Sequence, residues 1–436
     1  MGKLLVWVLC CVSLIGNAQE DTIRVMHYNL LNYGNYTSYC TSLNNNIDNK
    51  DDYLITILDY VKPDVFTVNE LGIDFVGLEN QNAIRILDNT LNINGVTKYQ
   101  KAAYTGNGYT VNMMYYNSEK LVFHKQETIA NGLHSGTLVR SVDFYTLYHK
   151  DPNLASHNDT VFITFVVAHL KAGSNQSDRN ERANAALDIM EFIENNNVGR
   201  ENRLLCGDLN LKGDTSRTFP TFTAYPVEGV RFSDPIDKPG YWAGDWQFKD
   251  IHSQSTRDFS ANGDCPAGGG LDDRFDLILA TQPILWGEMG VSYIPNSYNA
   301  VGNDGTSFNS DLNTITNTGV PQSVATALFN MSDHLPIVMD IRVSKDIVNG
   351  IYQAKIESLN VEFNNPVKSE LVVRVPNNVE VKQIVLYDIE GRIVYVNSST
   401  STTQFIIDTE SLNAGLYLLN VQTIAGKQGN YKVVKY

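Results

Sequence analysis

The sequence has 436 residues, of which 43% are hydrophobic, and it carries a formal net charge of −15. This length and composition are typical of a folded protein with one large domain and a smaller one, and they argue against a disordered chain. The acidic balance disfavours a broad basic surface that grips nucleic acid through many phosphates. A few basic side chains near one site are still sufficient for local binding of a phosphate.

Residues 1–18 have the pattern of a secretory signal peptide. A lysine precedes an apolar run at residues 4–15, which is too short to span a bilayer, and small residues occupy the −3 and −1 positions before a cleavage site after Ala18. A membrane anchor or a lipoprotein is the alternative, because two cysteines lie inside the run. No later stretch approaches about 20 apolar residues, so we expect no stable membrane insertion.

Cleavage after Ala18 leaves three cysteines, Cys40, Cys206 and Cys265. These are too few for a fold that depends on disulfides. Cys206 ends an apolar run and is predicted to be a buried thiol. Cys40 and Cys265 lie in polar surroundings, and the sequence leaves open whether they form a disulfide.

The region 19–343 alternates between strand-like and helix-like segments. Two amphipathic stretches, 53–61 and 182–193, have apolar residues spaced by three and four and are predicted to be helices. Long loops are expected at 228–273 and 295–323, and loops of that length usually carry function. Short β-rich runs, predicted to be strands, lie at 23–26, 65–68, 161–168, 204–206, 277–279 and 337–339.

Polar side chains stand at the ends of these predicted strands. Asn29, Glu70, His169 and the pair Asp208 and Asn210 follow four of the runs, whereas Asp276 and the pair Asp333 and His334 begin two others. If the last two strands run antiparallel to the first four, all of these side chains meet at one rim. Taken singly, each has an ordinary explanation, such as a solvated carboxylate or a satisfied core histidine.

Together and in this order the motifs resemble the endonuclease/exonuclease/phosphatase family, over about residues 22–343. Asn69 is a departure, because the family commonly has glutamine before its metal-binding glutamate. The resemblance implies an α+β fold, a four-layer α/β/β/α sandwich like that of deoxyribonucleases. The motifs are Met26-His27-Tyr28-Asn29, Pro63-Asp64-Val65-Phe66-Thr67-Val68-Asn69-Glu70, Ala168-His169-Leu170-Lys171, Gly207-Asp208-Leu209-Asn210, Arg274-Phe275-Asp276-Leu277-Ile278-Leu279 and Ser332-Asp333-His334-Leu335-Pro336.

The same resemblance implies roles for the site residues. Glu70 would hold Mg²⁺ or Mn²⁺, with Asn29 nearby and Asp333 sharing the site or supporting a second divalent ion such as Ca²⁺. Asp208, held by Asn210, would orient and deprotonate the attacking water. Asp276 would fix the tautomer of His334, and His169 would donate toward the phosphate or the leaving oxygen.

Five further residues are candidates for contact with substrate: Tyr109, Lys171, Arg182, His252 and Arg257. For Lys171 and Arg182 a solvated helix N-terminus is the alternative. A histidine at position 169 favours secreted hydrolases over the abasic-site repair branch of the family.

The predicted function is an extracellular nuclease that hydrolyses phosphodiester bonds of DNA or RNA in a metal-dependent way. One alternative is a phosphatase or phosphodiesterase that acts on lipid head groups or small phosphoesters, because the same core serves those substrates. Another is a surface binding protein that has lost catalysis. We expect the protein to be a monomer.

The character of the sequence changes after a polar linker at 344–353. Residues 354–436 are predicted to form a small all-β sandwich of about seven strands. This tail resembles the C-terminal sorting domain that Bacteroidetes use for type IX secretion, through Asn365-Pro366-Val367, Leu412-Asn413-Ala414-Gly415-Leu416-Tyr417 and the ending Lys432-Val433-Val434-Lys435. The resemblance implies passage through the periplasm and release outside the cell or at its surface, handled by the type IX machinery. An immunoglobulin-like adhesion or carbohydrate module is the alternative.

Overall fold

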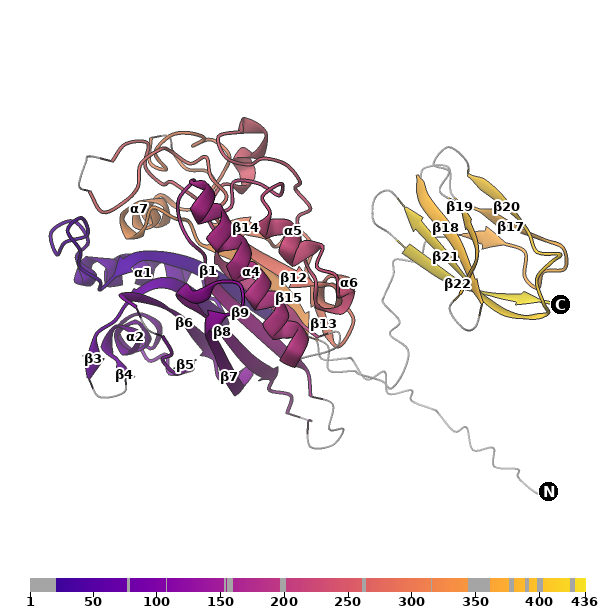
Figure 1. Ribbon diagram of the computed structural model, residues 1–436, viewed down its shortest axis with the longest axis horizontal. Coiled ribbons are helices and arrows are strands. Elements are labelled where there is room, and N and C mark those ends of the chain that lie inside the picture. Colours follow the sequence, from indigo (N-terminus) through magenta and orange to yellow (C-terminus); the bar gives the residue numbers. More distant parts are fainter. Residues whose placement is uncertain are drawn as a thin grey trace, which may run out of the picture. The chain divides into compact units, whose positions relative to one another are not determined.

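The computed structural model describes residues 21–76, 79–106, 108–152, 154, 160–196, 201–260, 264–314, 316–343, 361–375, 380–388, 392–397, 403–423 and 428–436. They form two compact units, residues 21–343 and residues 361–436 (Figure 1). The predicted signal peptide, 1–18, and the predicted linker, 344–353, lie outside the described residues. Among the helices in these ranges, none is long and apolar enough to cross a membrane.

The first sheet of the N-terminal unit has the strand order β13, β15, β1, β2, β6, β5, and β14 also pairs with β15. β1 runs parallel to β2 and antiparallel to β15. The strands are β1 (Asp21–Tyr33), β2 (Val65–Gly72), β5 (Tyr99–Lys101), β6 (Thr110–Asn117), β13 (Val291–Tyr293), β14 (Asn299–Ala300) and β15 (Ile337–Val343).

The second sheet has the order β11, β12, β10, β9, β8, β7. β10 is parallel to β9 and antiparallel to β12. The strands are β7 (Leu121–Gly132), β8 (Gly136–His149), β9 (Phe162–His169), β10 (Arg203–Asp208), β11 (Phe232–Ser233) and β12 (Asp276–Thr281), and a separate two-stranded ribbon is formed by β3 (Phe75–Val76) and β4 (Glu79–Asn80).

Helices cover the outer faces of both sheets. α1 (Ile47–Val61) begins at Asn46, whose side chain accepts from the N–H groups of Asp48 and Asn49, and it packs with α7 (Gln322–Met331) on the first sheet. α4 (Gln176–Asn196) and α5 (Thr218–Thr223) pack on the second sheet. The remaining helical segments are α2 (Gln81–Ile86), η1 (Leu87–Leu91), η2 (Glu228–Val230), η3 (Trp246–Ile251) and α6 (Gln282–Trp286).

The alternation of side chains along β10 shows how the layers are joined. Leu204 and Cys206 belong to the core between the two sheets, whereas Leu205 belongs to the core beneath α4. The second sheet is therefore buried on both faces, which explains the nearly continuous apolar runs in its central strands. The predicted four-layer α/β/β/α sandwich is confirmed.

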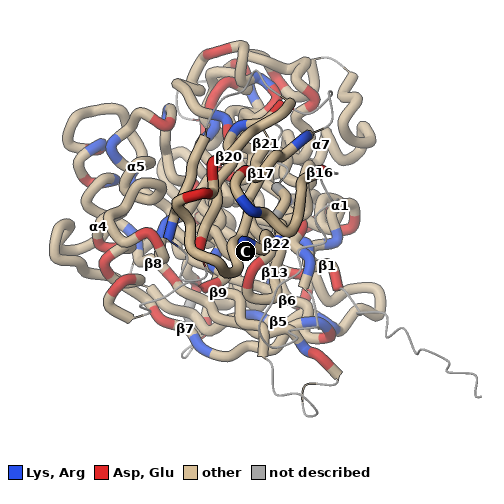
Figure 2. Tube along the Cα trace, turned by 90° about the vertical axis from the view of Figure 1, so that its right-hand side faces the viewer, with Lys and Arg blue, Asp and Glu red and all other residues tan. Residues whose placement is uncertain are grey.

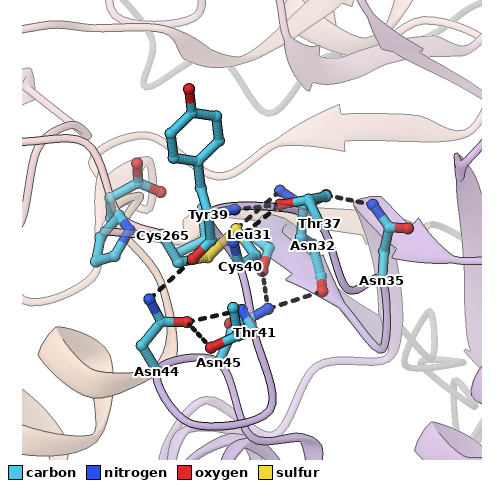
Figure 3. Close-up of a disulfide and its surroundings, with 12 residues drawn as sticks. Leu31, Asn32, Asn35, Thr37, Tyr39, Cys40, Thr41, Asn44, Asn45 and Cys265 are labelled. Carbon is cyan, nitrogen blue, oxygen red and sulfur yellow. Dashed lines mark hydrogen bonds between the residues drawn. A yellow bond between two sulfur atoms is a disulfide. The ribbon is translucent and has the colours of Figure 1, made fainter. Parts of the chain in front are cut away.

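Both predicted helices and five of the predicted strands lie inside longer elements, and the strand predicted at 161–168 is β9, shifted by one residue to Phe162–His169. Cys206 is a buried free thiol, as expected. The sequence left open whether Cys40 and Cys265 are paired, and in the structure they form a disulfide (Figure 3).

The C-terminal unit is all β and has its own apolar core of valine, leucine, isoleucine and phenylalanine side chains. The described residues contain seven strands, in agreement with the prediction. One sheet contains β16 (Glu362–Phe363), β17 (Glu370–Arg374) and β20 (Gln404–Asp408), and the other contains β18 (Val381–Asp388), β19 (Ile393–Asn397), β21 (Gly415–Thr423) and β22 (Gln428–Lys435).

Candidate active site

Strand register brings three predicted residues side by side. On β10, Asp208 pairs with His169 on parallel β9 and with Asp276 on antiparallel β12. Paired residues share a face of a sheet, and Asp208 shares the face of Leu204 and Cys206, which points toward the first sheet. In the first sheet, β1 and β2 pair Asn29 with Asn69, one residue before Glu70. The expected antiparallel direction of β12 and β15 is confirmed.

Asp208 lies at the centre of this group and is almost completely buried. Its Oδ2 accepts a hydrogen bond from the side-chain amide of Asn29 at 3.0 Å and lies 3.4 Å from Nε2 of His169 and 3.8 Å from Nε2 of His334. Burial raises its pKa to about 7, and the nearby His334 opposes the rise. A carboxylate with such a pKa is suited to take a proton near neutral pH.

His334 and Asp276 form a buried hydrogen-bonded pair. Nδ1 of His334 donates to Oδ2 of Asp276 at 2.7 Å, and the hydroxyl of Ser253 donates to the same oxygen at 2.7 Å. Burial by itself lowers the pKa of His334, but Asp276, Asp208 and Asp333 together raise it well above 6.5. The other ring nitrogen lies 3.1 Å from the amide nitrogen of Gln254, and a half turn of that amide would present its oxygen instead.

Glu70 is at the end of β2 in a left-handed conformation with φ of 58°. Its Oε1 accepts from the amide of Asn29 at 3.2 Å and its Oε2 accepts from the backbone N–H of Asn32 at 2.9 Å. The amide oxygen of Asn29 is taken by the N–H of Leu31. Asn29 therefore links the carboxylates of Glu70 and Asp208, and its predicted place in the metal site stays a prediction.

The carboxylates of Glu70 and Asp333 offer the oxygen ligands that a hard divalent cation prefers. Oδ2 of Asp333 accepts from the N–H of Ala267 at 2.8 Å, whereas Oδ1 is buried without a hydrogen-bond partner. A buried carboxylate oxygen with no partner is costly unless a cation or water satisfies it. Asp208, Asp276 and His334 are also close enough to share an ion. We favour Glu70 and Asp333, because His334 and Asp276 are already hydrogen-bonded to each other.

His169 is buried at the end of β9, with Nε2 3.9 Å from Glu70 and no partner for Nδ1. Burial, and then the charges of Arg140 and His334, hold its pKa well below 6.5. The ring is therefore neutral near pH 7. Beside it is a cavity of about 320 Å³ between the β8 end of the β7–β8 hairpin and α4, lined by Arg140, Lys171, Leu138, Leu170 and Asn184 among others.

Asn210 was predicted at the site, and its backbone N–H donates to Oδ1 of Asp208 at 3.1 Å. Asn69 was noted in the sequence only as a departure from the family's motif, and Lys50 was not predicted. Asn69 accepts the N–H of Asp208 at 2.9 Å, and Asn210, in a left-handed conformation with φ of 52°, donates to the carbonyl of Leu170. Lys50 is buried and donates to the carbonyls of Leu30 and Leu31 at 2.7 and 2.6 Å. Burial lowers the pKa of Lys50 to about 7, while Asp333 and Glu70 oppose the change. Lys50 gave no signal in the sequence, because lysine is common on helices.

The predicted substrate-contact residues differ in their surroundings in the structure. Tyr109 is 83% exposed, and its side chain makes no hydrogen bond or ring contact with the described residues. Lys171 lines the cavity beside His169 but pairs with Asp178 at 3.0 Å. Arg182 is buried and donates to the carbonyls of Lys171 and Gly173 at 2.6 and 2.8 Å. Arg182 therefore holds the loop after β9, and its guanidinium is not free for a substrate.

The other two predicted contacts are also engaged in packing. His252 is fully buried, with Nε2 2.8 Å from the carbonyl of Trp242 and its ring stacked on Phe308. This position corrects the prediction of a substrate contact by His252. Arg257 lies over the ring of Phe329 at 4.4 Å and near Asp333.

Residues 363–435 match the family described as secretion system C-terminal sorting domain. The C-terminal unit carries this sorting domain. The match confirms the resemblance expected for the tail and indicates export to the cell surface or the extracellular space. No curated protein matches the sequence.

Three solved structures are similar to this chain over almost their whole length. The catalytic domain of human Nocturnin with bound sulfate is 14% identical, with a TM-score of 0.44, and the match covers 74% of this chain and 97% of that one. An endonuclease/exonuclease/phosphatase family protein from Bacteroides thetaiotaomicron is 13% identical (TM-score 0.44, 76% and 98%). An endonuclease/exonuclease/phosphatase from Beutenbergia cavernae is 14% identical (TM-score 0.45, 94% and 99%).

Proposed function

We propose that the N-terminal unit is a metal-dependent phosphodiesterase, with nucleic acid as its substrate class. The observation that supports this best is the convergence of Asp208, the His334 and Asp276 pair, His169 and Glu70 at one end of two facing sheets. Opposing acid and base groups with shifted pKa values, gathered beside a carboxylate site for a hard cation, suit attack of water on a phosphodiester.

Each residue has a distinct task in this mechanism. Asp208 takes a proton from the attacking water, and the Asn29 amide keeps its carboxylate in position. His334, protonated and held by Asp276, donates from Nε2 to a phosphoryl oxygen as charge develops there. The neutral ring of His169 donates a hydrogen bond toward the phosphate or the leaving oxygen. Glu70, with support from Asp333, would hold a Mg²⁺ or Mn²⁺ ion, which would supply positive charge for the phosphoryl oxygens.

The cavity beside His169 supports a substrate larger than a phosphate. Its volume of about 320 Å³ is at the lower end for ligand sites, and its lining combines Arg140 and Lys171 with the aliphatic side chains of Leu138 and Leu170. A cationic edge with an apolar floor suits one nucleotide unit. Along the described part of the chain trace, basic residues are interspersed with acidic ones in the view of Figure 2, and the formal net charge of the sequence is −15. We therefore expect recognition of a few nucleotides near the scissile bond.

We propose that the protein acts outside the cell. The sorting domain supports export, and the predicted signal peptide supports entry into the periplasm beforehand. The type IX machinery would handle the tail, as the resemblance implied.

Hydrolysis of a bis-nitrophenyl phosphodiester tests the reaction. EDTA should abolish turnover, and Mg²⁺ or Mn²⁺ added afterwards should restore it. Separate assays with Ca²⁺ added to Mg²⁺ or to Mn²⁺ test whether a second cation contributes to turnover. Turnover that persists in EDTA would contradict the mechanism.

A panel of substrates tests the substrate class. Plasmid DNA, RNA, sphingomyelin, an inositol phosphate and a phosphomonoester should be compared at equal enzyme concentration. We expect the highest kcat/KM with DNA or RNA. A higher value with the lipid or the inositol phosphate would replace nucleic acid in the proposal and leave the reaction type intact.

A further inference from the structure

The Cys40–Cys265 disulfide joins two loops that hold the two candidate metal carboxylates. Cys40 lies between β1 and α1, and Cys265 lies in the segment before β12. The two residues are 225 positions apart in the sequence, and their Cα atoms are 4.3 Å apart. The cross-link therefore fixes a contact between loops that belong to different layers of the sandwich.

The first loop contacts Asn32, which lies near the end of β1 and binds Glu70. The backbone N–H of Asn32 donates to Oε2 of Glu70 at 2.9 Å, and its side-chain amide donates to Sγ of Cys40 at 3.5 Å (Figure 3). The amide of Asn45 donates to the carbonyl of Asn32 at 2.9 Å. Asn32 has a left-handed conformation with φ of 50°, which few residues adopt without support from their surroundings.

The second loop controls Asp333 in a similar way. Ala267, two residues after Cys265, donates its N–H to Oδ2 of Asp333 at 2.8 Å. The carbonyl of Ala267 accepts from the hydroxyl of Ser255 at 2.6 Å. Asp333 thus receives a backbone N–H from one cross-linked loop, and Glu70 receives one from Asn32, whose side chain donates to the cross-linked sulfur of Cys40.

We propose that the disulfide is a positioning brace that holds Glu70 and Asp333 in the arrangement a divalent cation needs. The inference rests on the proposed function. Two carboxylates that share a cation repel each other when the cation is absent, so their loops must resist separation. A cross-link between the loops restricts this motion, and groups that orient metal ligands commonly change metal affinity when they are lost.

The test compares the full chain with the Cys40→Ser/Cys265→Ser variant. Calorimetric titration with Mn²⁺ should give a Kd about tenfold higher for the variant, in line with the loss of an orienting contact. The increase in Tm that Mn²⁺ causes should be smaller for the variant, because this increase depends on the ratio of metal concentration to Kd. Turnover should recover when Mn²⁺ is saturating.

A disulfide that only stabilises the fold gives a different result. It lowers Tm equally with and without Mn²⁺, and it leaves the Kd for Mn²⁺ unchanged. Either of these results would overturn the proposal that the disulfide positions the two carboxylates. If the oxidised wild-type protein binds no Mn²⁺ and no Mg²⁺, the proposed function itself fails, so the two failures can be told apart.

Reduction of the folded protein provides a second measurement if the variant does not fold. A water-soluble phosphine cleaves the S–S bond with one water molecule, which gives two thiols and a phosphine oxide. After desalting, the reduced wild-type protein should show the same rise in Kd, with unchanged far-ultraviolet circular dichroism. The variant treated in the same way is the control, and a change in its Kd would assign the effect to the phosphine and overturn the inference.

Discussion

The residues of the candidate site have opposite responses to the same buried environment. Burial disfavours the charged form of Asp208 and of His169, so both lean toward neutrality. His334 is equally enclosed, but three carboxylates surround it and keep it protonated. Neighbouring charges therefore decide which group can accept a proton and which can donate a hydrogen bond.

Replacing Asp276 by asparagine tests whether the charge of Asp276 keeps His334 oriented and protonated. Asp276→Asn removes the negative charge at 2.7 Å from Nδ1, and we expect kcat to fall by about 100-fold or more while KM changes little. Steady-state kinetics with the bis-nitrophenyl substrate measure this change. Ser253→Ala, which removes the other hydrogen bond to the same oxygen, is the matched control and should cost about tenfold or less. Equal losses for the two variants would argue against a charge effect.

The pH dependence of kcat tests the role of Asp208. The carboxylate must lose its proton before it can act as a base, and its pKa is raised to about 7. We therefore expect kcat to rise with pH and to level off above about pH 7, with the midpoint shifted lower when a cation is bound. Measurements at saturating substrate and metal separate this effect from binding. A kcat that falls across the same range would exclude Asp208 as the base.

At the scale of elements, hydrogen bonds between strands connect the two sheets behind the site. Asn69 on β2 accepts the N–H of Asp208 on β10 and donates to Asn112 on β6. Asn112 in turn donates to the carbonyl of Val167 on β9 at 3.1 Å and to Asp143 on β8 at 3.2 Å. These amides satisfy polar groups that would otherwise be buried without partners, and they fix the positions of the strand ends that carry the site.

The buried carboxyl of Asp143 in this network should make the stability of the protein depend on pH. Burial raises its pKa from 3.8 to about 6, against the hydrogen bonds that lower it. Between those values the folded protein keeps a proton that the unfolded chain has lost, so this contribution to stability is present below about pH 4 and lost as pH rises through 6.

Chemical unfolding of wild type and Asp143→Asn at several pH values measures the effect. The free energy of unfolding of wild type, relative to the variant, should decrease by about 2 kcal/mol from pH 4 to pH 7. A constant difference between the two proteins would show that Asp143 does not titrate in this range.

At the scale of the whole molecule, the two units have separate cores and separate tasks. The apolar residues of the C-terminal unit form a cluster of their own, and the site lies entirely within residues 29–334. Export and hydrolysis should therefore be separable by mutation.

Deletion of 354–436 tests this separation. The truncated protein should stay inside the cell, and immunoblots of medium and cell fractions show where it is. The full-length Asp276→Asn variant, inactive but with its tail, should still be exported and is the control. Normal release of the truncated protein would contradict a sorting role for the tail in this chain.

The sequence by itself determined much of the fold, because local periodicity depends on which face of an element is buried. Apolar runs in β9, β10 and β12 identified strands, and spacing by three and four identified α1 and α4. The strands β5 to β8 and the helix α7 were missed. β7 is mostly half-buried and mixes apolar with polar side chains, so it lacks a clear pattern.

The position of each site residue relative to a strand end was also in the sequence, and strand direction was enough to bring them to one rim. Only the tertiary structure decided the contacts between distant segments. The pairing of Cys40 with Cys265, the burial of His252, the use of Arg182 on backbone carbonyls and the approach of Arg140 to His169 all depend on how loops of different layers pack. Such contacts arise from long-range packing and leave no periodic signal along the chain.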